Sequence, residues 1–461
     1  MSINNKVTKI KQDSIRKQIN QCDIMRFSNL LRSEELRVHF DECIPEFRQR
    51  LYPPTETLSM FLTQALSQDR SCQNIVNKAS FDNVLEGKPT NSVSTGAYCK
   101  ARQRIPIELI QRLTRETAHQ LSKHVLLLWK WKGKRVKLID GTSVTMPDTA
   151  DNQRVFPQQK TQAEGLGFPI CRLVGVVCLS TGAVMDAAVS QIEGKGTGEQ
   201  SLLRQLQDGF EEGDLILGDA YFGTYFFLAF LIANKVDAVM EQLGVRKKLI
   251  DFSKGEKIGS KDHVITLEKP KRRPDWMTQE EYDSAPKSLK IRELKVGGKV
   301  LITTMLSPKE ATKSELKNLY KQRWHVELDF RNIKTTLKME HLSCKSADMS
   351  EKEIWVYFLA YNLIRILMCQ AALLSERLPR QLSFKHTVQL WLFWSQAGSE
   401  LNEEQTLQFF MLVAGKEVGK RGGRVEPREV KQRPKPFKFL TVKREIARED
   451  IRKNGHPKKL K

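Results

Sequence analysis

Apolar residues recur at spacings of three and four positions along the first part of the chain. The segments 56–66 and 107–113 show this pattern most clearly, and it is typical of helices that bury one face. A loop rich in Gly, Pro, Asn and Ser at 87–97 separates them. We therefore predict a helical bundle over residues 1–132.

The pattern changes at Val136, where short, continuous apolar runs begin. Their length and the turns between them are typical of buried strands. The predicted strands cover 136–140, 172–179, 184–190, 214–219 and 236–241, and the predicted helices cover 198–206 and 222–234. The order is β-β-β-α-β-α-β, with three antiparallel strands leading into a mixed sheet. This order is typical of the ribonuclease H-like fold, so we predict an α/β protein with a ribonuclease H-like core.

The alternation of strands and helices stops after Glu241. A charged, turn-rich segment follows, which predicts a β-rich insertion, and then a long helix is expected from about Ser314 past Lys338. An apolar helix at 350–374 should pack beneath the core. The predicted domains are a helical N-terminal domain (1–132), the first part of the core (133–243), the insertion (244–306), the second part of the core (307–380) and a C-terminal region with a basic tail (381–461).

The chain carries a large excess of positive charge. It holds 76 Lys and Arg against 54 Asp and Glu, a formal net charge of +22, and its pI is about 9.6. Such an excess indicates a polyanionic partner, either nucleic acid or an anionic membrane surface. Residues 415–461 alone hold 17 Lys and Arg against 6 Asp and Glu. We predict that this tail is extended and lies along phosphates, with a solubilising tail as the alternative. The basic segment 100–104 is either a DNA contact or a solvated helix face.

Membrane insertion and secretion are both disfavoured. The most apolar long stretch, 357–374, contains Asn362, Arg365 and Gln370, and no run reaches the roughly 18 uncharged residues of a spanning helix. The segment 1–17 is polar and basic, without the apolar region of a signal peptide. The eight cysteines are scattered, with no C-x2-C pair, which argues against a disulfide framework or a zinc ribbon. We expect a cytoplasmic protein.

Two aspartates follow apolar strands directly. Asp140 ends the first predicted strand and Asp219 ends the fourth. Either one alone is more simply a turn or helix-capping residue. The two strands would be neighbours in a ribonuclease H-like sheet, however, so both carboxylates would meet at the edge where α/β proteins bind ligands. Like charges at that distance need a cation between them, and oxygen-only ligation suits Mg²⁺ or Mn²⁺.

The long helix after the insertion offers a third acid. Tyr320, Arg323, Glu327 and Lys334 fall within an arc of roughly 60° at 100° per residue, so they would share one face. One metal-binding carboxylate would then lie between cations that can hold phosphates. The alternative is a solvated face on which Glu327 pairs with Arg323 and Arg331 at i±4.

The segment Tyr320–Lys334 matches the pattern Y-x2-R-x3-E-x6-K. With the segments around Asp140 and Asp219, it resembles the transposases of the IS-four family of bacterial insertion sequences. The resemblance extends to 341–346, 359–365 and 423–437.

The resemblance implies a DDE transposase in which Asp140, Asp219 and Glu327 hold two Mg²⁺ or Mn²⁺ ions. It implies that Arg323 and Lys334, with Arg331 beside them, hold DNA phosphates, and that Tyr320 contacts the DNA strand end. In a member of that family a tryptophan of the insertion holds a flipped base, and the matching position here is Lys299. The only tryptophan of the insertion, Trp276, lies elsewhere.

The implied reaction is cut-and-paste transposition. Water would cut the transposon end, and the freed 3′-hydroxyl would attack the target DNA. The implied partners are double-stranded DNA, as terminal inverted repeats and as target, and a second copy of the chain in a synaptic homodimer associated with the bacterial nucleoid. Two other functions are possible alternatives. A catalytically inactive, DNA-binding descendant should have lost the acidic triad, yet all three acids are present. The other alternative is a metal-dependent nuclease of the same fold. A membrane-surface protein is a distant third.

Overall fold

Strands that are apolar on both faces form the centre of the protein. The computed structural model describes residues 34–44, 46, 51–89, 92–123, 125–247, 250–397, 401–419 and 437–456. In the first strand, β1 (Arg135–Thr145), Val136 and Leu138 enter one apolar layer and Ile139 enters the other. A strand buried on both sides appears as a continuous apolar run, which is why the sequence predicted a strand at 136–140. The prediction that Asp140 ends this strand is wrong: β1 continues to Thr145 through the more polar residues 141–145, so Asp140 lies in the middle of the strand.

Nine strands form one mixed sheet in the order β3-β2-β1-β4-β5-β9-β8-β7-β6. The first three strands are antiparallel neighbours, whereas β1, β4 and β5 run parallel. The further bounds are β2 (Ile170–Cys178), β3 (Val184–Gln191), β4 (Asp214–Gly218), β5 (Asp237–Glu241), β6 (Glu256–Gly259), β7 (Asp262–Glu268), β8 (Ser288–Val296) and β9 (Lys299–Thr303). All five strands predicted between 136 and 241 are present.

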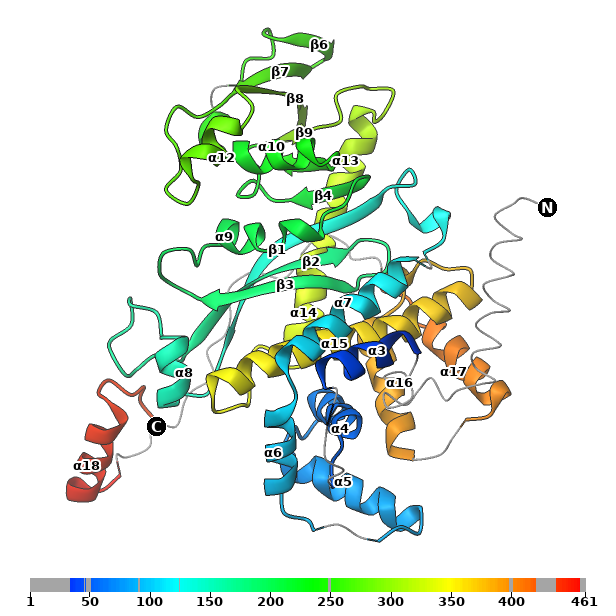
Figure 1. Ribbon diagram of the computed structural model, residues 1–461, viewed down its shortest axis with the longest axis vertical. Helices are drawn as coiled ribbons and strands as arrows, with labels where there is room; N and C mark the ends of the chain where they lie inside the picture. The colour runs from blue at the N-terminus through cyan, green and yellow to red at the C-terminus, as the bar shows by residue number, and fades with distance from the viewer. Residues whose placement is uncertain are drawn as a thin grey trace.

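Helices cover both faces of this sheet (Figure 1). One face carries α9 (Glu199–Arg204) and α10 (Tyr225–Ala233), and the other carries α7 (Ile107–Lys123), α14 (His325–Arg331) and α15 (Ala347–Leu374). The predicted order of strands and helices is confirmed, with a short helix α8 (Ala150–Val155) added between β1 and β2. Among the described residues, α15 alone is long and apolar enough to cross a membrane, and 89% of its apolar window is buried inside the protein.

The N-terminal part is helical, as predicted, over the residues that the structure describes. Its helices are α3 (Glu34–Cys43), α4 (Pro54–Leu66), α5 (Cys72–Leu85), α6 (Gly96–Arg104) and α7, followed by a single turn η1 (Leu127–Trp129). They lie on the α15 side of the sheet (Figure 1). Residues 1–33 of the predicted domain lie outside the described residues.

The predicted insertion is rich in strands and joins the central sheet. It contains β6 to β9, with the short helices α11 (Gly244–Lys247) and α12 (Gln279–Ser284). Its last strand, β9, pairs antiparallel with β5, so the insertion continues the sheet instead of standing apart from it.

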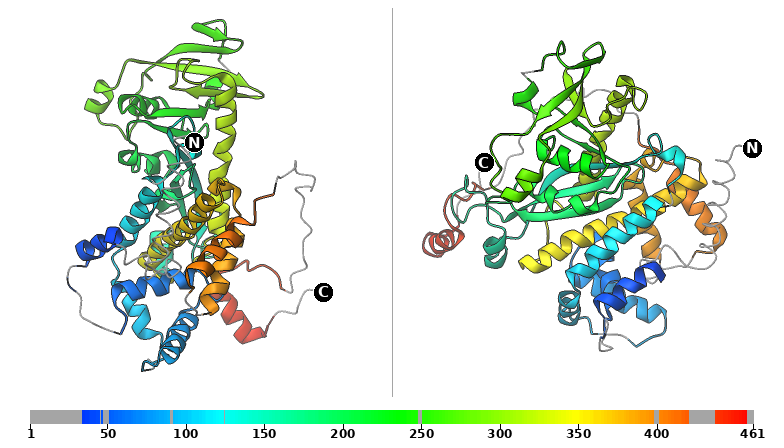
Figure 2. Two further views of the ribbon diagram at one scale, coloured as in Figure 1. Left: turned by 90° about the vertical axis from the view of Figure 1, so that its right-hand side faces the viewer. Right: turned by 45° about the horizontal axis from the view of Figure 1, so that its top comes forward.

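The long helix expected from Ser314 past Lys338 is interrupted. It consists of α13 (Lys313–Lys321), a 3₁₀ turn η3 (Gln322–Trp324), α14 and a π-helical turn η4 (Asn332–Thr336). Lys338 has a positive φ of 64°, which ends the segment. Figure 2 shows these pieces running from the insertion along the sheet towards the C-terminal helices. The arc predicted for Tyr320, Arg323, Glu327 and Lys334 assumed 100° per residue throughout. It is therefore wrong in detail, because each residue of a 3₁₀ or π turn rotates the chain by a different angle.

Over its described residues, the C-terminal region adds three α-helices. They are α16 (Phe384–Ala397) and α17 (Glu403–Ala414), which pack near α15, and α18 (Arg444–Asn454). The prediction of a wholly extended tail is wrong for α18. Residues 444–454 contain strong helix formers without Gly or Pro, and Gly455 ends the helix with a φ of 78°. The Gly- and Pro-rich stretch 420–436 lies outside the described residues.

A buried charge network fastens α14 to its surroundings. The carboxylate of Asp329, which is 1% exposed, accepts hydrogen bonds from Arg365 Nη2 (2.7 Å), Arg380 Nη2 (2.9 Å) and the Tyr361 hydroxyl (2.9 Å). On the same helix, Phe330 packs on the strand β2 at Gly175, where a Cβ would lie 2.9 Å from the ring. Gly in a strand allows such a close approach. Together these contacts set the distance between α14 and the sheet.

We predict that Asp329→Ala lowers the free energy of unfolding by about 3–5 kcal/mol, because it leaves Arg365 buried without its counter-ion. The matched control is Asp82→Ala, which removes an exposed i,i+4 partner of Lys78 and should cost about 0.3–0.5 kcal/mol. Urea denaturation of both variants measures the difference. Equal losses would show that the network does not hold α14.

Candidate active site

The sheet places Asp140, in the middle of β1, beside Asp219, which directly follows β4. β1 and β4 pair in parallel with Leu138 opposite Leu217, and Asp140 and Asp219 each lie two residues further along. Asp140 Oδ1 accepts a hydrogen bond from its neighbour Gly141 N (2.9 Å), and Asp219 Oδ1 accepts one from Tyr221 N (2.8 Å). The predicted adjacency of the first and fourth strands is therefore confirmed.

Glu327 reaches this edge of the sheet from α14. Arg323 lies between it and Asp140, with Nη2 donating to Glu327 Oε1 (2.8 Å) and Nη1 lying 3.6 Å from Asp140 Oδ2. The side chain of Arg323 is 14% exposed and Tyr320 is 7% exposed. The pairing of Glu327 with Arg323 was part of the solvated-face alternative. Arg323 and Tyr320 are more buried than residues of a solvated face, whereas the Glu327 side chain is 33% exposed.

Asp140 is electrostatically strained in its ionised form. The pKa of its carboxyl is raised from 3.8 to about 6, with burial as the largest cause and the charges of Asp219 and Glu327 acting in the same direction. The hydrogen bond from Gly141 and the charge of Arg323 act in the opposite direction. A buried acid with two acidic neighbours gains most from an added cation.

Beside these acids lies a cavity of about 250 Å³. Lys334 lines it and its Nζ lies 3.5 Å from Thr142 Oγ1, and the exposed Arg331 lines it too. The other lining residues are Asp140, Gly141, Glu327, Phe330, Thr335 and Glu340. The interrupted helix thus still directs Glu327 and Lys334 into one cavity.

Tyr320 and Lys299 meet at the insertion side of the site. Lys299 Nζ lies 5.5 Å from the centre of the Tyr320 ring and 2.7 Å from Glu241 Oε2. The Tyr320 hydroxyl is buried and has no hydrogen-bond partner among the described residues. Burial raises the pKa of this phenol, so it stays neutral. Trp276 lies elsewhere, stacked over Arg204 with 3.9 Å between the guanidinium carbon and the ring centre.

Sequence reasoning missed one further acid, Glu199. It is the first residue of α9 and lies against Gly141, where a Cβ would come within 2.9 Å of its Cγ and closer to its carboxylate. Burial raises the pKa of Glu199, Arg172 lowers it and Asp219 raises it. The one sequence feature that could have drawn attention to Glu199 was its position directly after Gly198, in the helix between the third and fourth strands.

The donor set suits a hard divalent cation. The site offers carboxylate oxygens, without the thiols or imidazoles that zinc sites use. As the side chains stand, no three His, Cys, Asp or Glu groups of the described residues are gathered closely enough to hold a metal ion. Arg323 fills the space between Asp140 and Glu327. The residues therefore fit Mg²⁺ or Mn²⁺ by chemistry, provided that the guanidinium moves aside.

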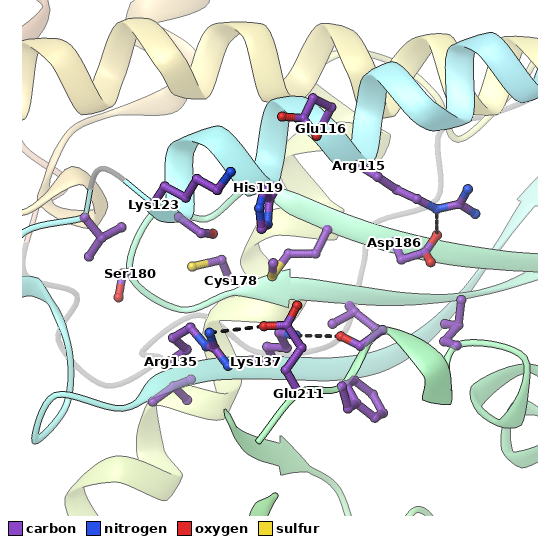
Figure 3. A pocket seen from close by; sticks show the side chains of 18 of the residues that line it. Arg115, Glu116, His119, Lys123, Arg135, Lys137, Cys178, Ser180, Asp186 and Glu211 are labelled. Atoms are coloured by element: carbon purple, nitrogen blue, oxygen red, sulfur yellow. Dashed lines mark hydrogen bonds and ion pairs between the residues drawn. The ribbon is translucent and has the colours of Figure 1, made fainter. Parts of the chain in front are cut away.

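A larger cavity of about 560 Å³ lies at the other end of β1 (Figure 3). Six Lys and Arg side chains line it against three acids. The acids are engaged, since Asp186 pairs with Arg115 (2.8 Å), Glu211 pairs with Arg135 (3.1 Å) and Glu116 accepts a hydrogen bond from Gln120. This larger cavity is cationic, and its three acids do not form a cluster that could hold a metal ion.

Comparison with known proteins gives three findings. The family model described as the transposase DDE domain matches residues 131–363, a range that includes Asp140, Asp219 and Glu327. The transposase InsG for insertion sequence element IS4 of Escherichia coli (strain K12) is 27% identical over 407 residues, which are 86% of this chain and 88% of that protein. A cryo-EM structure of the piggyBac transposase synaptic complex with hairpin DNA is 11% identical, with a TM-score of 0.38, over 86% of this chain and 80% of that one.

We predict that Asp140→Asn stabilises the protein in the presence of a chelator. Raising a carboxyl pKa from 3.8 to about 6 corresponds to about 3 kcal/mol, which is the most that the substitution should add at pH 7.5. Because the folded-state pKa is raised, the ionised Asp140 destabilises the fold above pH 6. The gain should shrink as the pH falls through 6 and should vanish below about pH 4.

Urea denaturation at several pH values measures this gain. The exposed Asp208 provides the control variant Asp208→Asn, which should change stability little at any pH. A gain for Asp140→Asn that does not depend on pH would contradict the proposed strain.

Proposed function

The chain belongs to the DDE transposases, as a transposase of the IS4 type of insertion sequence, and we propose that Asp140, Asp219 and Glu327 are its catalytic acids. The observation that carries this proposal is their convergence from β1, β4 and α14 on one edge of the sheet, where Asp140 is strained in its ionised form. They would hold two Mg²⁺ or Mn²⁺ ions.

We infer that the core is ribonuclease H-like. The support is the order β3-β2-β1-β4-β5, in which three antiparallel strands are followed by two parallel ones joined through helices. In this proposal the core comprises residues 133–243 and 307–380, the insertion 244–306 interrupts it, residues 1–132 bind DNA, and residues 381–461 form the C-terminal region.

The proposed reaction is hydrolysis at the transposon ends followed by transfer of the 3′-hydroxyl to target DNA. When bound, the two ions would activate the attacking oxygen and stabilise the leaving one in an in-line displacement at phosphorus. The three carboxylates, from the middle of β1, from the residue after β4 and from α14, would hold these ions and in that way fix where the reacting phosphate lies. Asp140 and Tyr320 are largely buried, and electrostatic interactions are stronger in such surroundings than in bulk water.

The cations of the helical segment would hold the DNA backbone. Lys334 and Arg331 line the same cavity as Glu327, so a phosphate placed there would meet both charges. Arg323, which neutralises Asp140 and Glu327 in the protein alone, would turn to a phosphate once other cations take over that task. Such charged hydrogen bonds are among the strongest that a protein makes. Tyr320 would contact the strand end, and Lys299 beside it would take the place of a base-holding residue.

The proposed partners are double-stranded DNA and a second copy of the chain. The net charge of +22 favours terminal inverted repeats and target DNA as binding partners. In a homodimer each subunit would bind one transposon end. Such a protein would act in the cytoplasm of a bacterium, on the nucleoid.

We expect Asp140→Ala, Asp219→Ala and Glu327→Ala each to reduce cleavage and strand transfer at least about a thousand-fold. Binding to end DNA should stay nearly unchanged, because the acids hold metal rather than DNA. Cleavage of labelled transposon-end DNA and gel-shift binding measure the two effects. Mg²⁺ and Mn²⁺ should support cleavage, and a chelator should stop it.

Glu340→Gln is the matched control for these variants. Glu340 lines the same cavity but is exposed and lies outside the proposed triad, so its variant should cut normally. A triad variant that cuts as fast as the wild type would refute the assignment.

Lys334→Ala should separate holding of the cut end from the first nick. The substitution removes one point charge from the DNA contact and leaves the carboxylates in place, so binding of cut ends should weaken about tenfold. First-strand nicking should be less affected, and Tyr320→Phe should be milder still because the ring remains. A time course on end-labelled DNA resolves nicked, hairpin and fully cut products. If Lys334→Ala blocks the first nick as completely as Glu327→Ala, this division of roles is wrong.

A further inference from the structure

Glu199 approaches the proposed catalytic centre from the face of the sheet opposite Glu327. It begins α9, which packs in the apolar layer of Ile139, whereas α14 packs in the layer of Leu138. Its side chain lies on the Cα of Gly141, the residue that follows Asp140. The edge of the sheet at Asp140 is therefore flanked by one glutamate on each face.

The carboxylate of Glu199 is half-buried and has no bound donor. Within the described part of the chain no group donates a hydrogen bond to it and no cation lies within ion-pair distance. Arg172 attracts it from further away, but the Arg172 guanidinium already donates to Thr197 O (2.9 Å). Asp219, by contrast, is close enough to repel it. Removing a carboxylate from water without giving it a hydrogen bond is unfavourable, so Glu199 would gain from a hydrogen-bond donor that the protein itself does not supply.

A purely local role for Glu199 explains these contacts poorly. Acids stabilise helix N-termini through the helix dipole, but α9 has only six residues and its dipole is correspondingly small. An acid that only stabilises the first turn of α9 would not need to contact Gly141. The contact requires glycine at position 141, since any side chain there would displace the Glu199 carboxylate.

We propose that Glu199 is a fourth acid of the catalytic centre and acts as a positioning residue on the α9 face. Its carboxylate would accept hydrogen bonds from water bound to the cation next to Asp219. Mg²⁺ and Mn²⁺ sites commonly retain several water ligands, and outer carboxylates that orient such ligands change metal affinity about 10- to 100-fold. The inference rests on the proposed function, because it requires a metal ion at Asp140 and Asp219.

The test compares Mn²⁺ dependence in the wild type and in Glu199→Gln. The substitution keeps the shape of the side chain and removes its charge. We expect the Mn²⁺ concentration for half-maximal nicking to rise at least tenfold. Mn²⁺ binding to the complex with a pre-cut transposon-end duplex, followed by the electron paramagnetic resonance of free Mn²⁺, should weaken equally. End binding should not change, the thermal midpoint should not fall, and Glu199→Asp should recover part of the metal affinity.

Glu193→Gln is the matched control, because Glu193 is an acid shortly before α9 that lies near Lys160. It should leave the Mn²⁺ dependence unchanged. If the wild-type complex binds no Mn²⁺, the proposed function itself fails. If the wild type binds Mn²⁺ and Glu199→Gln matches it in both binding and nicking, the fourth acid is refuted and the proposed function stands.

A double-mutant cycle tests the same inference without relying on Glu199→Gln. Gly141 has no positive φ, so Gly141→Ala strains the backbone little and acts through Glu199. Gly141→Ala should raise the Mn²⁺ requirement in the wild type and should add nothing in a Glu199→Ala background. Additive effects of the two substitutions would show that they act independently, which would overturn the proposal.

Discussion

The site depends on how closely α14 approaches the sheet. Asp329 is tied to α15 and to the turn at Arg380 by buried, charged hydrogen bonds, and the next residue, Phe330, occupies the space that Gly175 leaves open on β2. Gly175 is the β2 partner of Asp140. The same contacts that anchor the helix therefore bring Glu327, two residues before Asp329, to the level of Asp140. A buried network that loses one partner costs several kcal/mol, so this spacing is strongly enforced.

The cost of that arrangement is an excess of negative charge at one edge of the sheet. Asp140, Asp219, Glu327 and Glu199 come from β1, from the residue after β4 and from two helices (α14 and α9), on both faces of the sheet. Among the described residues, Arg323 is the one cation that forms ion pairs with members of this group. Repulsion among these carboxylates therefore lowers the stability of the folded protein as long as no cation is bound. A site that destabilises the fold until cations and phosphates bind is the usual compromise between stability and activity.

The sequence predicted those features that a one-dimensional pattern contains. The buried strands appear as continuous apolar runs, and their order is enough to make β1 and β4 neighbours and to bring Asp140 and Asp219 together. The interruption of the helix at Gln322–Trp324 and Asn332–Thr336 was missed, because an apolar spacing of three and four residues does not distinguish 3₁₀ and π turns from a regular α-helix. The contacts of Asp329 and Glu199 were missed because their partners, Arg365 and Gly141, lie far away in the chain, and no spacing rule connects them.

The account stands on the claim that Asp140, Asp219 and Glu327 share divalent cations once Arg323 moves aside. Anomalous diffraction at the manganese edge, from crystals grown with Mn²⁺ and a pre-cut transposon-end duplex, tests it directly. The account predicts manganese peaks bound by these three carboxylates, with Arg323 turned from between Asp140 and Glu327 towards a DNA phosphate. Peaks bound by other residues, or Arg323 unmoved with no manganese at the three acids, would contradict it.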